Sequence, residues 1–464
     1  MTDFNNIKGF YFTGIGGIGM SALALYFADK GYVVAGYDRT SGDITDRLSR
    51  KGCEISFTDD VSSIPQLFRE IKSKDKVIIV YTPAIPAESR ILNFFRDNNY
   101  RLLKRSEVLG ELSSETDTIA VAGTHGKTTV STMTAFLLHE SHVGCSAFLG
   151  GISRNFDSNL LIGKGRYTVM EADEYDRSFH RLSPLMAVVT STDADHLDIY
   201  GDHETMIAAY NEFCRKIRPG GTLLINSAIR KRITCPEGLQ FLTYGSGPDA
   251  DFIFFNVENK CKFYTYSIQT PCGIMKDLKF PFPGIVNIEN MTAAIALAMN
   301  CGVKEEEIRE AMIHFQGVRR RFDIRVNLPG IAYVDDYAHH PEEIRACITS
   351  LREYFGGRKI TGIFQPHLFS RTFDHADGFA AILDELDEVI LLPIYPAREK
   401  PIPGVTSELI LGRMKLRNKR VIPMEKVIQE LDVTRLDVLA TIGAGDIDRL
   451  VAQIEEKIKR EVRK

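Results

Sequence analysis

The stretch Gly123-Thr124-His125-Gly126-Lys127-Thr128-Thr129 decides how the rest of the chain is interpreted. It follows an apolar, strand-like run at residues 118–122 and precedes a helix-like segment at residues 130–138. In this layout, backbone N–H groups and the N-terminus of a helix surround a polyphosphate. The lysine of such a loop reaches the outer phosphates, and the hydroxyl that follows it ligates Mg²⁺.

The spacing of this stretch departs from the usual P-loop, which has a glycine five residues before the position of Gly126. Val121 stands there in this chain. We therefore interpret residues 123–129 as a shortened phosphate loop. A structural turn with a solvated lysine is the alternative interpretation.

Length and composition limit the classes of protein that need to be considered. At 464 residues the chain predicts two to four domains. Its 44% hydrophobic and 25% charged residues are ordinary for a soluble globular protein, and its net charge of −4 gives no support for nucleic-acid binding. Eight cysteines without a C-x-x-C spacing favour reduced thiols over disulfides or a zinc site. With no leader-like start and no long apolar run, we expect a cytoplasmic protein without a membrane partner.

The first predicted domain, residues 1–105, alternates strands and helices. A strand at residues 10–13 leads into G-x-G-x-x-G, a helix covers residues 20–29, and a strand at residues 32–37 ends at Asp38. This order, with an acid about twenty residues after the glycines, is the fingerprint of a dinucleotide fold. The glycines would let a diphosphate approach the backbone, whichever nucleotide carries it. A tight turn without a ligand is the alternative. The candidate binding residues are Gly14, Gly16, Gly17, Gly19 and Asp38.

Two more α/β domains are predicted, at residues 106–321 and 322–464. Strands separated by helices favour parallel sheets in all three domains. A hairpin-rich stretch near residues 250–282 predicts a smaller antiparallel patch, followed by a helix at residues 287–300. The remaining expected strands are 77–81, 167–170, 186–190, 222–225, 331–334, 360–364, 388–392 and 438–442, and helices are expected at 342–354, 371–385 and 446–460.

Four carboxylates lie within Glu171-Ala172-Asp173-Glu174-Tyr175-Asp176, directly after an expected strand. Like charges at this density are costly unless cations gather beside them. Mg²⁺ on a nucleotide phosphate would remove that cost. Glu171 comes directly off the strand and is the first candidate for a metal ligand, whereas a solvated acidic loop is the alternative.

Two further groups would complete a nucleotide site. His196, embedded in the carboxylates of residues 193–198, can ligate a second metal ion, or it can be an ordinary loop histidine. Two cations near a γ-phosphate are a recurring arrangement in phosphoryl transfer. Asn287 and Asn290 carry amides that can read an adenine edge, with simple N-capping by Asn287 as the alternative.

Polar clusters in the third domain follow its expected strands. Arg319, Arg320 and Arg321 stand at the predicted boundary, where an arginine can clamp a γ-phosphate. Open α/β sheets bind ligands at the ends of their strands. The other candidates there are Asp336, Tyr337, His339, His367 and Arg371.

Eight motifs, in this order along the chain, resemble those of the Mur ligases: GTHGKTT, EADEYD, DADHLD, N-x-x-N, RRRFD, DDYAHHP, FQPH and AREKPIPG. The resemblance covers essentially the whole chain. It implies three α/β domains: a Rossmann-like N-terminal domain for UDP, a central P-loop-type ATPase domain with a mostly parallel sheet, and a Rossmann-like C-terminal domain. The implied reaction uses ATP and Mg²⁺ to join L-alanine to the lactyl carboxylate of UDP-N-acetylmuramate through an acyl phosphate, early in peptidoglycan synthesis. We expect a monomer or homodimer.

The resemblance also assigns roles to individual residues, with the chemistry on Lys127, His196 and Arg321. The ATP phosphates would contact Gly123, Thr124, Gly126, Lys127, Thr128, Thr129 and Arg321, and the adenosine would lie beside Asn287, Asn290, Asp336, Tyr337 and His339. Thr128 and Glu171 would hold one Mg²⁺ and His196 the second. The UDP-sugar substrate would be bound by His125, His367 and Arg371, with its diphosphate on Gly14 to Gly19. By this resemblance the glycines bind UDP rather than a nicotinamide dinucleotide.

Three positions depart from family patterns. Val286 stands where a histidine is frequent, and Leu368 where an arginine is usual. Tyr210 stands where sister ligases that add acidic amino acids carry a carbamylated lysine, and the alanine-adding member shares this feature. The alternative functions are a recycling ligase that adds a whole tripeptide to the same UDP-sugar, a nicotinamide-dependent oxidoreductase and a nucleotide-gated binding module.

Overall fold

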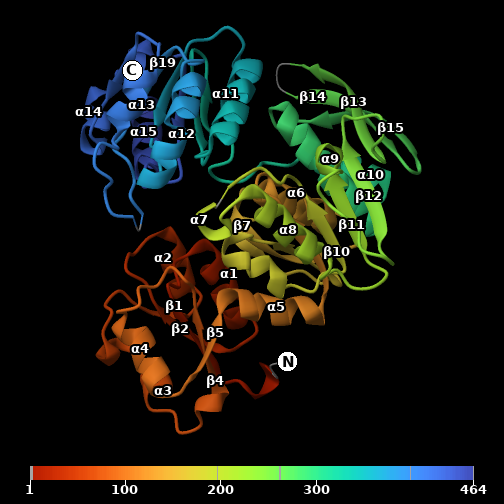
Figure 1. Ribbon diagram of the computed structural model, residues 1–464, viewed down its shortest axis with the longest axis vertical. Helices are drawn as coiled ribbons and strands as arrows, with labels where there is room; N and C mark the ends of the chain where they lie inside the picture. The colour runs from red at the N-terminus through yellow and green to blue at the C-terminus, as the bar shows by residue number, and fades with distance from the viewer. Residues whose placement is uncertain (1–3, 196, 261–262, 398, 463–464) are drawn as a thin grey trace. The chain divides into compact units, whose positions relative to one another are not determined.

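The computed structural model describes residues 4–195, 197–260, 263–397 and 399–462, and their strands form three β-sheets (Figure 1). Each sheet takes its strands from one of the three predicted domains, so the expected three-domain α/β fold is confirmed. The exact domain boundaries stay a prediction. By compactness the chain forms two units, residues 1–257, 266–279 and 289–315 in the first, and residues 258–265, 280–288 and 316–464 in the second.

The first sheet has five parallel strands in the order β3-β2-β1-β4-β5. The strands β1 and β4 are almost fully buried, as their apolar runs predict for a parallel sheet covered on both faces. The sequence analysis did not predict strands β3 and β5, because they are short and carry polar residues. The elements are β1 (Gly9–Thr13), α1 (Ile18–Asp29), β2 (Val33–Tyr37), α2 (Asp43–Arg50), β3 (Glu54–Ser56), α3 (Gln66–Arg69), β4 (Val77–Tyr81), α4 (Arg90–Asp97) and β5 (Arg101–Lys104).

The central sheet has ten strands in the order β15-β14-β13-β12-β11-β10-β6-β9-β7-β8. Its middle strand, β6 (Asp117–Ala122), lies between β9 (Tyr167–Glu171) and β10 (Met186–Val189), all parallel. The expected small patch near residues 250–282 is not a separate sheet, because β13 pairs in parallel with β12 and extends the central sheet. The other strands are β7 (Cys145–Ser153), β8 (Ser158–Leu161), β11 (Thr222–Asn226), β12 (Gln240–Gly245), β13 (Phe252–Asn259), β14 (Tyr264–Thr270) and β15 (Gly273–Phe280).

The helices of the central domain lie before, between and after the strands of the central sheet in the sequence. The helices α5 (Arg105–Glu115) and α6 (Lys127–His139) precede and follow β6, and α9 (Ile285–Asn300) matches the helix expected at residues 287–300. The others are α7 (Leu197–Tyr200), α8 (His203–Cys214) and α10 (Glu305–Met312).

The first and central sheets share one hydrophobic core, in which the buried residues of α1 pack with Phe148 and Leu160 of the central sheet's β7 and β8. A polar contact fixes the same helix end, because Asn159 Nδ2 donates to the carbonyl of Ile18 at 2.5 Å. The start of α1 is therefore anchored from a neighbouring sheet.

The third sheet has the order β16-β17-β21-β18-β19-β20. Its first pair corrects the expectation of purely parallel sheets, because β16 and β17 are antiparallel. Only residues 329–330 join them, and a connection that short can link only antiparallel strands. The elements are β16 (Asp323–Leu328), β17 (Ile331–Asp336), α11 (Pro341–Phe355), β18 (Ile360–Phe364), α12 (Phe369–Leu383), β19 (Glu388–Leu391), α13 (Ser407–Arg413), β20 (Lys419–Val421), α14 (Val427–Glu430), β21 (Val438–Ile442) and α15 (Asp448–Val462).

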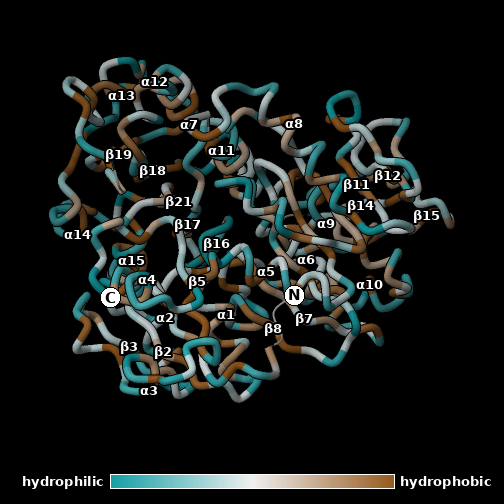
Figure 2. Tube along the Cα trace, turned by 60° about the horizontal axis from the view of Figure 1, so that its bottom comes forward, coloured by the Kyte–Doolittle hydropathy of each residue, from teal (hydrophilic) through white to brown (hydrophobic). Residues whose placement is uncertain are grey.

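Hydrophobic and hydrophilic stretches alternate along the trace (Figure 2). Within the part of the chain that the structure describes, no helix combines the length and apolarity needed to cross a membrane. The cysteines in that part are all free thiols, as the sequence predicts.

Candidate functional site

The phosphate loop, residues 123–129, connects β6 to α6 as predicted. Gly123 has φ +133° and Gly126, which caps α6, has φ +83°. A Cβ at Gly123 would stand 2.0 Å from Thr190 Oγ1. Both glycines are therefore required by backbone conformation, and Gly123 also by space.

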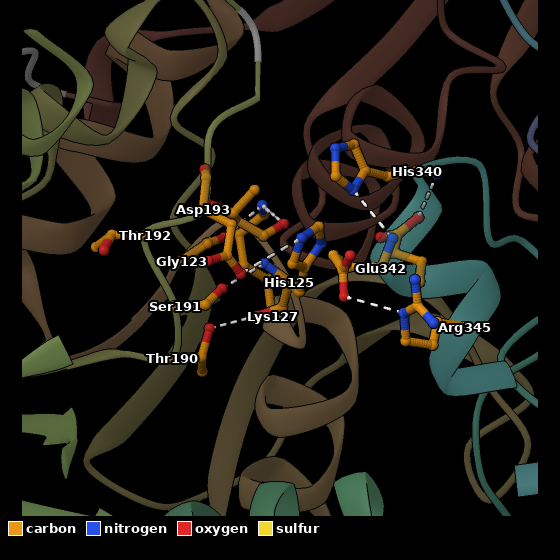
Figure 3. Close-up of polar contacts among 12 residues, drawn as sticks. Gly123, His125, Lys127, Thr190, Ser191, Thr192, Asp193, His340, Glu342 and Arg345 are labelled. Atoms are coloured by element: carbon orange, nitrogen blue, oxygen red, sulfur yellow. Dashed lines mark hydrogen bonds and ion pairs between the residues drawn. The ribbon is translucent and has the colours of Figure 1, made fainter. Parts of the chain in front are cut away.

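The segment that follows β10 fixes the loop from one side (Figure 3). His125 N–H donates to Ser191 Oγ at 2.8 Å, and Thr124 Oγ1 donates to the Asp193 carbonyl at 2.8 Å. Thr190 Oγ1 donates to the carbonyl of His125. These bonds hold the loop in shape, so it is built in advance of any ligand.

Lys127 is directed at Glu174, a residue that the sequence analysis did not select. Its Nζ lies 2.8 Å from Glu174 Oε2 and 2.9 Å from Oε1, and it also donates to the carbonyls of Gly123 and Thr124 at 2.6 and 3.2 Å. Burial alone would lower the pKa of Lys127, but the carboxylates of Glu174, Asp173 and Glu171 outweigh it and raise that pKa. Burial raises the pKa of Glu174 to about 7, against the opposing charge of Lys127.

The acidic loop, residues 171–176, meets cations of the chain itself at three of its four carboxylates. Asp173 lies 3.5 Å from Arg105, Asp176 lies 3.1 Å from Lys104, and Glu174 pairs with Lys127. Glu171 differs from them, since among the described residues its carboxylate forms no ion pair within 4 Å and its buried Oε2 has no hydrogen-bond partner. One carboxylate is thus left for a cation from outside the chain.

Glu171 is placed where a metal ion would serve the phosphate loop. It ends β9 beside Val121 of β6, at the edge where the loop begins. Carboxylate and hydroxyl oxygens suit Mg²⁺, which takes most of its other ligands from phosphate and water. In the described part of the chain, no cluster of three metal-ligating side chains is found. Thr128 in the first turn of α6 can supply the hydroxyl, and His196 lies outside the described residues.

The two asparagines on α9 have different surroundings. A Cβ on Gly126 would stand 2.9 Å from Asn290 Oδ1, so this amide lies directly against the phosphate loop. Asn287 donates from Nδ2 to the Pro283 carbonyl at 2.6 Å. Because α9 begins at Ile285, Asn287 lies inside the first turn and is not its N-cap.

The glycine loop, residues 14–19, connects β1 to α1. Asp38 Oδ2 accepts the N–H of Gly16 at 2.8 Å, and Oδ1 accepts that of Thr40 at 3.2 Å. Asp38 therefore fastens the glycine loop in this structure, and its contact with a substrate stays a prediction.

In the third sheet, the strand ends gather most of the residues that the sequence predicted there. Asp336 accepts N–H bonds from Phe322 at 2.7 Å and Ala338 at 2.8 Å, which fixes the backbone next to Arg321. Burial raises the pKa of Asp336 to about 6, with Arg321 opposing. Both oxygens are thus occupied, and a bond from Asp336 to a nucleotide stays a prediction.

The three adjacent arginines differ in the contacts that they make. Arg320 bonds to Asp335 and to the carbonyl of Gly443, at 3.3 and 2.6 Å, whereas Arg319 is exposed. The Arg321 guanidinium lies 5.1 Å from the centre of the Tyr337 ring and 3.8 Å from Glu343. The Arg320 guanidinium lies at the same 5.1 Å from that ring, so the two arginines differ in their carboxylate partners, which are Asp335 for Arg320 and Glu343 for Arg321.

The histidines of the same sheet form a row of rings. His339 lies 6.0 Å from His367, which stacks on Tyr395 at 5.7 Å, and His339 Nδ1 lies 3.2 Å from Glu343. Burial lowers the pKa of His339, while Glu343 acts in the opposite direction and Arg371 adds to the lowering. His340 caps α11 by accepting from the N–H of Glu342 (Figure 3).

Models of one protein family match three consecutive parts of the chain. They are the Mur ligase family catalytic domain at residues 9–116, the Mur ligase middle domain at residues 121–298 and the Mur ligase glutamate ligase domain at residues 320–460. The chain belongs to the Mur ligase family.

Individual relatives of this Mur ligase are similar over the full length. It is 45% identical to a UDP-N-acetylmuramate–L-alanine ligase of Parabacteroides distasonis, over 100% of both chains. It is also 45% identical to the protein of that name from Phocaeicola vulgatus, over 97% of this chain and 98% of the relative. A crystal structure of a UDP-N-acetylmuramate–alanine ligase from Thermotoga maritima has a TM-score of 0.83 and 25% identity, covering 98% of this chain and 99% of that chain.

Within this Mur ligase, Tyr210 occupies the position at which acid-adding sister ligases are expected to carry a lysine. Its side chain is fully buried on α8, and burial raises its pKa well above the ordinary value. A buried neutral phenol offers no substitute for the charge of a carbamylated lysine.

Proposed function

We propose that this chain is an ATP-dependent ligase that joins L-alanine to the carboxylate of UDP-N-acetylmuramate in peptidoglycan precursor synthesis. One observation carries the proposal: the chain matches ligases of that name at 45% identity over their whole length. A phosphate loop with a half-buried Lys127, and a Glu171 carboxylate whose Oε2 has no hydrogen-bond partner among the described residues, support the use of ATP and Mg²⁺.

The chemistry begins from a carboxylate, which has no leaving group. The lactyl carboxylate attacks the γ-phosphate of ATP, forming an acyl phosphate and releasing ADP. The amine of alanine then attacks the acyl carbon, and inorganic phosphate leaves as the amide forms. An anion must approach another anion in the first step, so the barrier falls mainly through positioned positive charge.

The residues of this chain would supply that charge. Lys127 would exchange Glu174 for the phosphates of ATP, and the N–H groups of residues 123–129 would cradle them. A magnesium ion held by Thr128 and Glu171 would neutralise phosphate charge. Arg321 would reach the γ-phosphate, Asn287 and Asn290 the adenine, and His125, His367 and Arg371 the UDP-sugar.

We also infer that the enzyme works in the cytoplasm. The free thiols of the described residues support a reducing compartment, because disulfides persist mainly in oxidising ones. The proposed substrates, ATP and a nucleotide-activated sugar, also belong to the cytoplasm.

Phosphate release with UDP-N-acetylmuramate, ATP, Mg²⁺ and a panel of acceptors tests the proposed function. We expect release with L-alanine, less with serine or glycine, and none without the UDP-sugar. Release that requires the tripeptide instead would assign the recycling reaction. Release independent of any acceptor would contradict a ligase.

A further inference from the structure

Arg105 is a half-buried cation that neither the motifs nor the proposed mechanism uses. It is the first residue of α5 and follows β5 directly. Because β1, β4 and β5 are parallel, the carboxyl ends of these strands lie at one edge of the sheet, where the glycine loop also begins. Arg105 therefore stands at the ligand-binding edge of the first domain.

The guanidinium of Arg105 lies on one glycine of that loop. A Cβ on Gly19 would stand 2.6 Å from Arg105 Nη1 and 3.1 Å from its Cζ. Any side chain at Gly19 would displace the arginine. The third glycine of G-x-G-x-x-G thus makes room for a cation in this chain.

At the start of the glycine loop, the backbone N–H groups already donate to acceptors within the chain. Those of Gly14 and Ile15 donate to the Tyr37 carbonyl at 2.7 and 3.0 Å, and that of Gly16 donates to Asp38 at 2.8 Å. A helix leaves its first N–H groups without partners inside the helix, so those of Ile18, Gly19 and Met20 point out of α1. An anion on this loop would meet the start of α1, where Arg105 lies.

Charge balance calls for such a cation. A helix N-terminus offers about half a positive charge, whereas a diphosphate ester carries about two negative ones. The side chain of Arg105 is 23% exposed, and its Nη2 lies 3.5 Å from a carboxylate oxygen of Asp173. A guanidinium has five N–H donors in a fork that matches phosphate oxygens, so one long contact leaves it able to bind an anion.

We propose that Arg105 is a substrate-binding residue whose guanidinium neutralises the diphosphate of the UDP-sugar at the start of α1. The inference rests on the proposed function and adds to it a residue outside the eight motifs. Arg105 pairs with Asp173 in this structure, so the diphosphate would compete with Asp173 for the guanidinium. Since Asp173 is next to Glu174, the same acidic loop steadies the cations of both nucleotide sites.

Binding of UDP-N-acetylmuramate to the full chain, measured by titration calorimetry without ATP, tests the proposal. We expect Arg105→Gln to weaken this binding about tenfold, as for loss of a charge-assisted bond, and Arg105→Lys to weaken it less. Affinity for a nonhydrolysable ATP analogue should stay within about twofold, which shows that the variant is folded. The matched control is Arg101→Gln, which removes the same charge at the other end of β5, where Arg101 pairs with Glu111.

Asp173→Asn separates a substrate contact from a purely structural ion pair. It removes the partner of Arg105 but leaves the guanidinium, so UDP-sugar affinity should stay equal or rise. If Asp173→Asn weakens binding as much as Arg105→Gln, or if Arg105→Gln binds like the wild type, Arg105 is not a diphosphate ligand and the proposed function stands. If the wild type does not bind UDP-N-acetylmuramate at all, the proposed function fails instead.

Discussion

At the scale of single residues, the site depends on which charges face each other. Sequence spacing predicted that Lys127 and Glu171 belong to a phosphate site, and the fold places both beside the end of β6. It could not select Glu174, because four carboxylates within six residues look alike until the backbone decides which one is buried. In the structure Glu174 is 1% exposed and holds Lys127.

Lys127→Ala should remove ATP turnover while leaving UDP-sugar binding intact. The loss of a preorganised cation costs about 3 kcal/mol or more of transition-state stabilisation, which is at least a hundredfold in rate. Alanine-dependent ADP formation and calorimetric binding of the UDP-sugar measure the two effects. Lys216→Ala removes a lysine that is 38% exposed and pairs with Glu212, and serves as the control. Near-normal turnover of the Lys127 variant would contradict the assignment.

The three neighbouring arginines offer a second test. Arg321→Ala should lower the rate of ADP formation about a hundredfold, whereas the exposed Arg319→Ala should change it less than twofold. Arg320→Ala should instead lower the melting temperature, because it breaks the bonds to Asp335 and the Gly443 carbonyl. Equal kinetic losses at residues 319 and 321 would show that only general positive charge matters.

At the scale of elements, long and strongly patterned segments were predictable. The strands β4, β18 and β21 begin and end where the apolar runs do. Short strands such as β3 and β20 could not be found, because three residues carry no periodicity. The extension of the central sheet through β13 depends on tertiary pairing, which a local pattern does not contain. The antiparallel pair of β16 and β17, by contrast, follows from the short connection at residues 329–330, a local signal that the sequence analysis missed.

Gly123→Ala should unfold the phosphate loop rather than only perturb it. The substitution combines a φ of +133° with a Cβ 2.0 Å from Thr190 Oγ1. We expect a loss of about 2–5 kcal/mol in unfolding free energy and no detectable binding of an ATP analogue. Gly220 has φ +76° with nothing within 4 Å of its Cβ position, so Gly220→Ala should cost only about 1 kcal/mol and leave nucleotide binding unchanged. Denaturant titration measures the unfolding free energy, and calorimetry measures binding of the ATP analogue. Equal losses of unfolding free energy at the two glycines would show that the clash with Thr190 does not contribute.

The carboxylate of Glu307, in the first turn of α10, should make the stability of the fold depend on pH. Glu307 accepts the N–H of Lys304 and that of His142, each at 2.9 Å, and these bonds lower its pKa to about 2. A carboxylate whose pKa is depressed on folding stabilises the fold above its unfolded pKa of about 4.3, and this contribution disappears as the pH falls through 2.

Glu307→Gln should therefore lose about 1 kcal/mol at neutral pH and show a flatter acid limb than the wild type. Glu306→Gln, which neutralises an exposed residue in the same turn, is the control. Urea unfolding between pH 2 and 7 measures the difference. Parallel acid limbs for Glu307→Gln and the wild type would refute the assignment.

At the scale of the whole molecule, two compact units have separate cores. The larger core joins the first and central sheets, and another surrounds α15 in the second unit. We expect two thermal transitions. UDP without the sugar, which would lie on the glycine loop of the first unit, should increase the unfolding free energy of that unit alone, by about 2.7 kcal/mol at a hundred times its Kd.

Scanning calorimetry tests this expectation, and a core truncation assigns the transitions. Ile454 is fully buried in the core around α15, so Ile454→Ala should lower the other transition by about 2–5 kcal/mol. A single transition that shifts with both the ligand and the truncation would show that the units unfold together.

The ion pairs of the acidic loop, residues 171–176, have a consequence for how the enzyme depends on the supply of a metal ion. Asp173, Glu174 and Asp176 each have a counter-charge within the same polypeptide, so only Glu171 waits for an ion from outside. If Glu171 holds Mg²⁺ as proposed, a cell starved of magnesium would keep this enzyme folded but inactive. Under that proposal, restoring the ion would restore activity without synthesis of new enzyme.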